Sequence, residues 1–430
     1  MQWILVAGYL SLVLALMPRL RFFQLDGIQP RYVQSAFLLK VLAGIALGLI
    51  YSRYYTDRST ADTFKFFDDS RIIFQSLKSN PSDFFRMLSG YHSNGQDLEA
   101  TYYVRMTAWN NKELFLNDNR SIIRINVLFQ FLSLGNYYVH VVLWNLFSFT
   151  GLIFLFKAFR EMISGKDLLL FSGIFLFPSL LFWGSGLLKD GFLLFSVGLL
   201  LYFFLRIATK FSVPNLIGFV AGITGLIFNK FYILLLLLPG LIAFLTVKKI
   251  KLQPFWIYFI WYSFFTLIAY SAKYISPQFD FLSILEMKRR DFASIAITGK
   301  AIHMIHLSDA PLTPINFLLQ SPGAFARVLF RPFIWESDSF PILLAALENI
   351  FICVGIVLAF IWPSNKTSGN SIFWLSVFFI FSLFILLGTI TPILGAIVRY
   401  RIIAIPFMWM LWLQLTNLEK LQIRKFKSRN

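Results

Sequence analysis

The chain has 430 residues, of which 57% are hydrophobic and only 14% are charged. A soluble chain carries roughly 25% charged residues, so this composition excludes an ordinary soluble globule. The net charge of +18 would suit a nucleic-acid binder, but Lys and Arg also gather in the cytoplasmic loops of membrane proteins, and we expect no nucleic-acid partner. Cys353, the only cysteine, allows no internal disulfide and no cysteine metal cluster.

Long apolar runs recur along the whole sequence, and the charged residues fall mainly between them. Because a helix needs about 20 apolar residues to cross a bilayer, the runs predict a polytopic all-α membrane protein. Alternating segments of about ten residues, which are typical of a transmembrane β-barrel, are not seen. The predicted transmembrane helices are, in chain order, residues 2–17, 35–51, 137–156, 168–184, 190–206, 213–229, 231–247, 255–274, 341–362, 371–389 and 395–416, eleven in total.

The first run is not expected to be a cleaved signal peptide. Arg19 and Arg21 follow the apolar stretch, whereas a signal peptide carries its positive charges before it. Further along, the mostly apolar stretch 213–247 is interrupted by Asn229 and Lys230. This interruption favours two short spans over one long span.

We expect one integral-membrane domain with two long outer loops. The domain covers residues 1–430, with outer loops at 52–136 and 275–340 and a basic cytoplasmic tail at 417–430. In the first loop, the segments 61–78 and 121–134 have apolar residues at helical spacing with polar residues between them. These segments are therefore predicted to be amphipathic helices lying in the outer interface.

The basic residues gather on one side of the predicted membrane. One set of loops, together with the tail, contains seventeen basic residues against four acidic ones. Residues 52–120 and 275–340, on the other side, contain equal numbers of basic and acidic residues. Since Lys and Arg mark the cytoplasmic side, we expect the N-terminus outside and the C-terminus in the cytoplasm.

A few charges remain within the predicted spans, where ionisable groups are costly and usually functional. Lys189 and Asp190 begin a span, so Asp190 either only caps that helix or contributes to a polar cavity. Lys230 either reaches lipid headgroups or binds an anionic group such as a phosphate. Lys40 lies near the cytoplasmic end of its span, and we expect it to extend to the interface.

The later spans carry further candidates. Arg399 and Arg401 are two positions apart and share no helix face, so at most one of them is expected to face a cavity. Glu348 lies about two turns inside its span and is costly unless it is protonated or paired, so we expect an outer basic residue to pair with it. Arg331 is a candidate clamp for a lipid phosphate, and Glu336 is a further candidate.

The first outer loop supplies the carboxylates Asp62, Asp68 and Asp69. A solvated helix face explains most of them, and Asp62 also fits the N-cap position of the predicted helix. Asp62 and Asp69 lie about two turns apart on one face, whereas Asp68 points elsewhere. His303 and His306 are three apart, but no third ligand is evident, so we expect no metal site and no required cofactor, and a divalent metal is not indicated.

Four stretches carry a family resemblance. They are YYTDRSTADTFKFFDD, FPSLLFWGSGLLKDGFLLFSVGLLLYFF, GFVAGITGLIFNKFYILLLLLPG and GAIVRYRIIAIP. Together they resemble the GT-C class of integral-membrane glycosyltransferases, in particular the dolichyl-phosphate-mannose–protein mannosyltransferase and aminoarabinose-transferase group with its bacterial relatives. This chain departs from that group in having two predicted spans before the first large loop instead of one, and in lacking a literal Asp-Glu pair.

The resemblance implies an inverting transfer of a sugar from a polyprenyl-phosphate-linked donor to an unknown acceptor, a protein, lipid or glycan, on the outer face of a bacterial inner membrane. Asp62, or alternatively Asp69 or Asp68, would deprotonate the acceptor. Lys189, Lys230 and the arginines would hold the lipid phosphate, whose developing charge they would stabilise. The alternatives are an envelope polysaccharide polymerase, a transporter or flippase of lipid-linked sugars, and a non-catalytic subunit of an envelope machine.

Overall fold

The computed structural model describes most of the chain. The described residues are 2–54, 58, 61–107, 117–163, 165–298, 304–308, 310–337, 339–364 and 371–418. Within these ranges every named element is a helix. The prediction of an all-α fold is therefore confirmed for this part of the chain.

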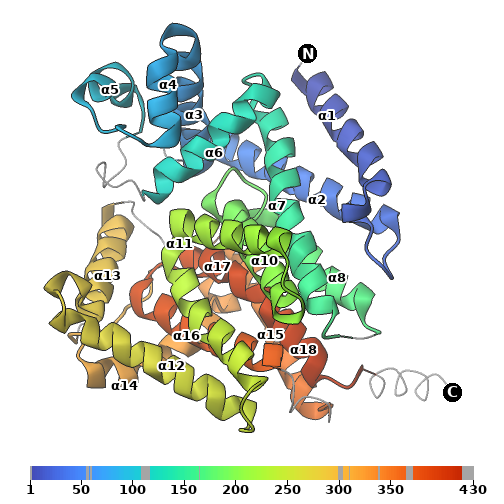
Figure 1. Ribbon diagram of the computed structural model, residues 1–430, viewed down its shortest axis with the longest axis vertical. Coiled ribbons are helices and arrows are strands. Elements are labelled where there is room, and N and C mark those ends of the chain that lie inside the picture. The colour runs from blue at the N-terminus through green and yellow to red at the C-terminus, as the bar shows by residue number, and fades with distance from the viewer. Residues whose placement is uncertain are drawn as a thin grey trace. The chain divides into compact units, whose positions relative to one another are not determined.

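The chain divides into two compact units, of which the first comprises Met1–Glu161 and Ile174–Leu234. Its helices are α1 (Gln2–Leu16), α2 (Pro30–Leu49), α3 (Asp62–Ser79), α4 (Pro81–Ser89), α5 (Gln96–Thr101), α6 (Asp118–Ser133), α7 (Tyr137–Arg160), α9 (Pro178–Trp183) and α10 (Lys189–Thr209). Figure 1 shows α3, α4, α5 and α6 gathered as one group of short helices within this unit.

The second unit comprises Met162–Gly173 and Leu235–Asn430. Its helices are α12 (Pro254–Ser271), α13 (Phe281–Thr298), α14 (Pro314–Phe330), α15 (Phe340–Ile361), α16 (Ser371–Ile390), α17 (Leu394–Tyr400) and α18 (Ile405–Leu415). Two helices, α8 (Asp167–Phe175) and α11 (Val213–Val247), have residues in both units. The sequence predicts one integral-membrane domain over residues 1–430, and that domain assignment stays a prediction.

Nine helical stretches in the described part of the chain are long and apolar enough to cross a membrane. The chain is thus an all-α polytopic membrane protein by the length and composition of its helices. The predicted number of eleven spans is not confirmed. The difference arises at the predicted span 168–184 and at the predicted pair 213–229 and 231–247.

The single helix predicted over 168–184 is wrong. The chain forms α8, leaves the helical conformation at Phe177 (φ −65°, ψ 126°) and begins the short α9 at Pro178. Proline has no backbone N–H to donate and disfavours the helical conformation of the residue before it. The prediction relied on the apolar composition of residues 168–184 and overlooked Pro178, which ends the helical conformation at Phe177.

The interruption predicted at Asn229 and Lys230 is confirmed as a break in helical geometry. Lys230 has non-helical dihedral angles (φ −134°, ψ 79°) inside the 35-residue helix α11. A straight helix of this length would extend about 50 Å, well beyond a hydrocarbon layer of about 30 Å. Whether each half crosses the membrane by itself stays a prediction.

The two amphipathic helices predicted in the first outer loop are confirmed as α3 and α6. They share one buried hydrophobic core with α4, α5 and α7. Their location at the outer interface stays a prediction. Phe67 of α3, Val127 of α6 and Trp144 of α7 are members of this core. The first outer loop is therefore a folded layer that holds its polar residues in defined positions.

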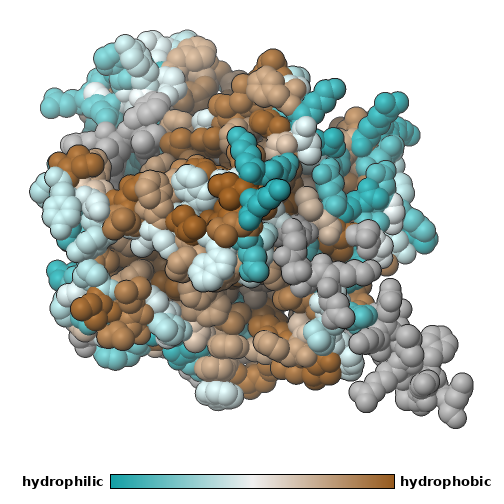
Figure 2. Space-filling model, turned by 60° about the horizontal axis from the view of Figure 1, so that its bottom comes forward, coloured by the Kyte–Doolittle hydropathy of each residue, from teal (hydrophilic) through white to brown (hydrophobic). Residues whose placement is uncertain are grey.

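Large apolar side chains are exposed on the helices proposed to span the membrane. Those of α12 include Trp256, Phe259, Ile260, Phe264 and Leu267. Figure 2 shows apolar residues over broad areas of the face in view, with hydrophilic residues gathered in a few places. Soluble monomers rarely expose broad apolar patches, whereas a lipid-facing surface requires them.

Helices α7 and α10 approach each other closely through glycine. A Cβ atom built on Gly198 of α10 would overlap the backbone of Gly151 in α7, and a Cβ on Gly151 would overlap the backbone of Phe195. Small residues that let two backbones approach are typical of helix packing in membranes. This crossing fixes α10, and with it the charged residues at its start.

We predict that Gly198→Ala destabilises the protein. Overpacking a close contact costs about 1–3 kcal/mol, because the two helices must separate to accept the methyl group. The melting temperature of the detergent-purified protein should fall accordingly. Gly8→Ala in α1 is the matched control, since a Cβ at Gly8 meets no atom within 4 Å. Equal melting temperatures for the two variants would contradict the packing described here.

Candidate functional site

The turn between α9 and α10 is held by polar side chains of α2 and α7. The carbonyl oxygen of Gly184 accepts hydrogen bonds from Lys40 Nζ (2.6 Å) and Ser148 Oγ (2.9 Å). The carbonyl oxygen of Ser185 accepts one from Asn145 Nδ2 (2.9 Å). Backbone groups outside a helix need such partners wherever lipid excludes water, so these contacts stabilise the break in helical structure.

The prediction that Lys40 extends to the cytoplasmic interface is wrong. Its side chain is 0% exposed, and its ammonium group donates to Gly184. The two residues are 144 positions apart, so no local pattern around Lys40 indicates this partner.

The same turn is fixed to the first turn of α3. Thr63 Oγ1 accepts a hydrogen bond from the Leu187 backbone N–H (3.3 Å) and shares another with the Tyr137 hydroxyl (2.7 Å). Asp62 is the first residue of α3, and Ala61 occupies the N-cap position predicted for Asp62. Anchoring Thr63 therefore also places Asp62 beside the start of α10.

Lys189 is the first residue of α10 and forms an ion pair with Asp118, the first residue of α6. The Lys189 Nζ lies 2.5 Å from Asp118 Oδ2, and the lysine side chain is largely buried. Lys189 also lies within electrostatic range of Asp62 and Lys230. The outer-loop helices α3 and α6 thus both supply carboxylates to the end of a membrane-spanning helix.

Asp190 is almost completely buried and faces Lys230 at the break in α11. Its Oδ1 lies 3.6 Å from Lys230 Nζ, and the neighbouring Asn229 donates to the backbone carbonyl of Lys189 (2.9 Å). Of the two readings of Asp190, a helix cap alone does not account for this pairing. The non-helical backbone at Lys230 brings its ammonium group to the start of α10.

These residues form one group, which we call the α10 charged cluster. Its members are Asp62, Asp118, Lys189, Asp190 and Lys230. When all are ionised, three carboxylates surround two ammonium groups. Each lysine is ion-paired with a carboxylate, Lys189 with Asp118 and Lys230 with Asp190. The cluster therefore offers cationic donors and a partly exposed carboxylate, Asp62, at the end of a span.

The other two acidic candidates of α3 have separate partners. Asp68 forms a two-bond ion pair with Arg58 (2.7 and 3.1 Å) on a partly exposed surface. Asp69 is buried and accepts a hydrogen bond from the Thr107 backbone N–H (3.1 Å). The contacts described for Asp68 and Asp69 thus differ from those of the α10 charged cluster.

The predicted arginines near the last spans lie in the second unit. Arg401 pairs with Glu348 at 3.5 Å, with side chains 1% and 3% exposed, which confirms the expected pairing of Glu348. Arg401 Nη1 also donates to the backbone carbonyls of Val328 (3.2 Å) and Arg331 (3.1 Å). Arg331 itself forms an ion pair with Glu336.

Arg399 lies half-buried on α17, whereas Arg401 is fully enclosed by its partners. The two arginines therefore have different environments, as expected from their spacing. The hydrogen bonds described here for Arg401 are made to backbone carbonyls of the second unit. Its guanidinium group stabilises this part of the second unit.

Asp118 is the member of the cluster that the sequence did not reveal. It follows Asn117, which caps α6 by accepting hydrogen bonds from Asn119 and Arg120. The capping residue Asn117 could have indicated that α6 begins at Asp118, which places this carboxylate in the first turn of an amphipathic helix. His303 lies outside the described residues, and among those described no group of three or more His, Cys, Asp or Glu is arranged to hold a metal ion.

Comparison with protein families, curated proteins and solved structures finds no match to this chain.

We predict that Glu348→Gln destabilises the protein by about 3–5 kcal/mol, because it leaves the buried Arg401 guanidinium without its counter-charge. The measurement is the free energy of unfolding in detergent. The double variant Glu348→Leu with Arg401→Met serves as the control and should be closer to wild type, since it removes both charges. A double variant less stable than the single one would contradict the unpaired charge as the cause, and would point to the bonds from Arg401 to the Val328 and Arg331 carbonyls.

Proposed function

We propose that the protein is an integral-membrane glycosyltransferase that uses a polyprenyl-phosphate-linked sugar as donor, with the α10 charged cluster as its reaction centre. The observation that supports this function best is the pairing of Lys189 with Asp118 and of Lys230 with Asp190 at the start of α10. Asp62 adjoins Thr63, which binds the turn before α10. A donor with a lipid tail and an anionic head requires apolar surface and cationic groups side by side.

In this proposal Asp62 acts as the general base. Its carboxylate takes the proton of the acceptor hydroxyl while that oxygen attacks the anomeric carbon of the donor. The bond from this carbon to the phosphate oxygen breaks, and its electron pair leaves with the polyprenyl phosphate. Partial exposure suits this role, because the acceptor must reach the carboxylate within hydrogen-bond distance.

Lys189 and Lys230 stabilise the leaving phosphate in the proposed reaction. Both ammonium groups are held by carboxylates of the cluster, Lys189 by Asp118 and Lys230 by Asp190. The 3.6 Å separation between Lys230 and Asp190 exceeds an ordinary charged hydrogen bond. In the proposed reaction, Lys230 stabilises the negative charge that develops on the leaving phosphate, which lowers the barrier.

The outer face of a bacterial inner membrane remains the proposed location of the reaction. Asp118 and Asp190 act as positioning residues for the two lysines. The sugar is to be identified by testing a panel of donors, and the acceptor by finding the molecule that receives the sugar.

We predict that Asp62→Asn lowers the rate of donor consumption by about 10²–10⁴-fold, the usual contribution of a general base. The protein is reconstituted in liposomes with a panel of radiolabelled polyprenyl-phosphate hexoses and pentoses and with a bacterial envelope extract as the source of acceptor, and released polyprenyl phosphate is measured. Asp68→Asn is the matched control, since Asp68 lies on the same helix but pairs with Arg58. An unchanged rate in Asp62→Asn, or no donor consumed by the wild type, would refute the proposal.

A further inference from the structure

A cavity of about 270 Å³ lies within the folded outer-loop layer of the first unit. It is separate from the α10 charged cluster, because none of the cluster residues lines it. Its walls combine apolar side chains with polar ones. The residues that bear on a ligand are Met87 of α4, Glu99 of α5, Tyr103, Thr107, and Arg120 and Arg124 of α6.

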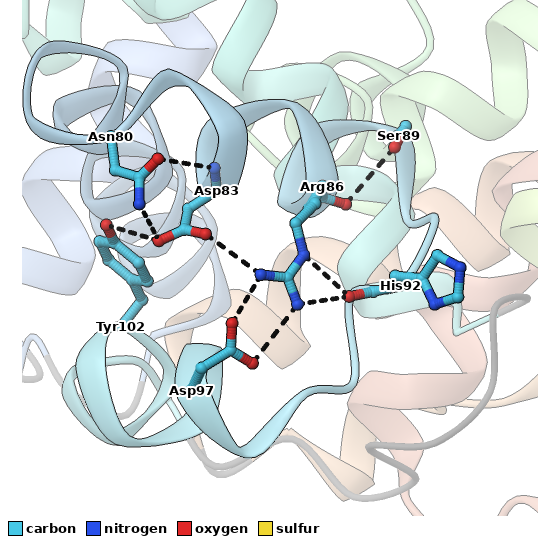
Figure 3. A network of polar contacts seen from close by, with 7 residues as sticks. All are labelled: Asn80, Asp83, Arg86, Ser89, His92, Asp97 and Tyr102. Carbon is cyan, nitrogen blue, oxygen red and sulfur yellow. Dashed lines mark hydrogen bonds and ion pairs between the residues drawn. The ribbon is translucent and has the colours of Figure 1, made fainter.

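Next to the lining residue Met87, Arg86 ties α4 to α5 without lining the cavity itself. Its guanidinium donates to Asp97 (2.6 and 3.3 Å), to Asp83 (3.2 Å) and to the backbone carbonyl of His92 (3.3 and 3.1 Å), as Figure 3 shows. The hydrogen bond from Arg86 holds the pKa of Asp97 below its usual range. These contacts tie the loop after α4 to α5.

One wall of the cavity is anchored by Asp69. This buried carboxylate binds the Thr107 backbone N–H, and Thr107 lines the cavity. Asp69 therefore has an evident task outside the α10 charged cluster. It fixes the segment that closes one side of the cavity.

Two arginines of α6 contribute charge to the lining. Arg120 lies over the Tyr103 ring at 4.5 Å, and its Nη1 donates to Asn94 (3.2 Å). Arg124, one turn further, donates its Nε to the Met87 carbonyl (3.1 Å). Like charges four positions apart on a helix repel each other, so placing both on one cavity costs stability. A bound anion offsets that repulsion.

Among the lining residues that the structure describes, the balance of charge is positive. Arg120 and Arg124 outnumber the one carboxylate described there, Glu99. Burial lowers the pKa of Arg124, but arginine stays protonated in neutral water. Burial also raises the pKa of Tyr103, so its phenol remains neutral and presents a ring face that Arg120 already stacks upon.

We propose that this cavity is a binding site for a small anionic ligand, in which Arg120 and Arg124 contact a phosphate or carboxylate and Tyr103 packs against its body. Planar guanidinium groups match both anions with paired hydrogen bonds. The volume lies just below the usual range of about 300–1,000 Å³ for ligand sites, which limits the body to roughly a monosaccharide. The site does not depend on the glycosyl transfer proposed above.

The experiment measures ligand-induced shifts in melting temperature of the full-length protein in detergent. The probes are inorganic phosphate, glucose 6-phosphate, glucuronate and neutral glucose. At least one anion should give a saturable shift, and glucose should give none. A larger affinity for glucose 6-phosphate would assign a phosphate ligand, and a larger affinity for glucuronate a carboxylate.

Arg120→Gln should weaken the apparent affinity by about tenfold or more, as expected for the loss of a charged hydrogen-bond partner. Its side chain bonds only Asn94 and the Tyr103 ring in the contacts described here, so this variant tests the site even where Arg124→Gln fails to fold. Arg105→Gln, at an exposed position outside the lining, is the matched control and should bind as wild type does.

Three results would overturn the site. They are the absence of a saturable shift with every anion, an equal shift with neutral glucose, and an unchanged affinity in Arg120→Gln. Because none of these measurements requires donor turnover, a failure here is distinguishable from a failure of the proposed transferase activity.

Discussion

Backbone groups that leave a helix inside a packed protein must find hydrogen-bond partners, and the first unit is organised around one such place. The turn before α10 exposes the carbonyls of Gly184 and Ser185, which Lys40, Ser148 and Asn145 satisfy. Without these donors each unpaired carbonyl would cost several kcal/mol in lipid. The break between α9 and α10 exists because two neighbouring helices complete it.

The position of the α10 charged cluster follows from that turn. Thr63 binds Leu187 in the turn, which brings α3 to the start of α10, and the glycine crossing with α7 holds α10 itself. The ion pairs of Lys189 and Lys230 then join helices that are distant in sequence. Buried charges are tolerated here because each has a partner of opposite sign.

The sequence predicted helices well where apolar length was the only requirement, and less well where a distant partner decides the outcome. Lys189, Asp190 and Lys230 were identified because charge within an apolar run is conspicuous whatever its surroundings. Lys40 was misread by the same rule, since only Gly184 explains its burial. Asp118 was missed because an acidic residue in a polar loop is ordinary until α6 is placed beside α10.

The bond between Lys40 and Gly184 also has a consequence for how the protein is made. The two residues are 144 positions apart, and at about 5–20 residues per second roughly 7–30 s of synthesis separate them. During that interval α2 carries an ammonium group whose acceptor does not yet exist. The hydrogen bond that accompanies the burial of this group can therefore form only after α9 and Gly184 have been synthesised.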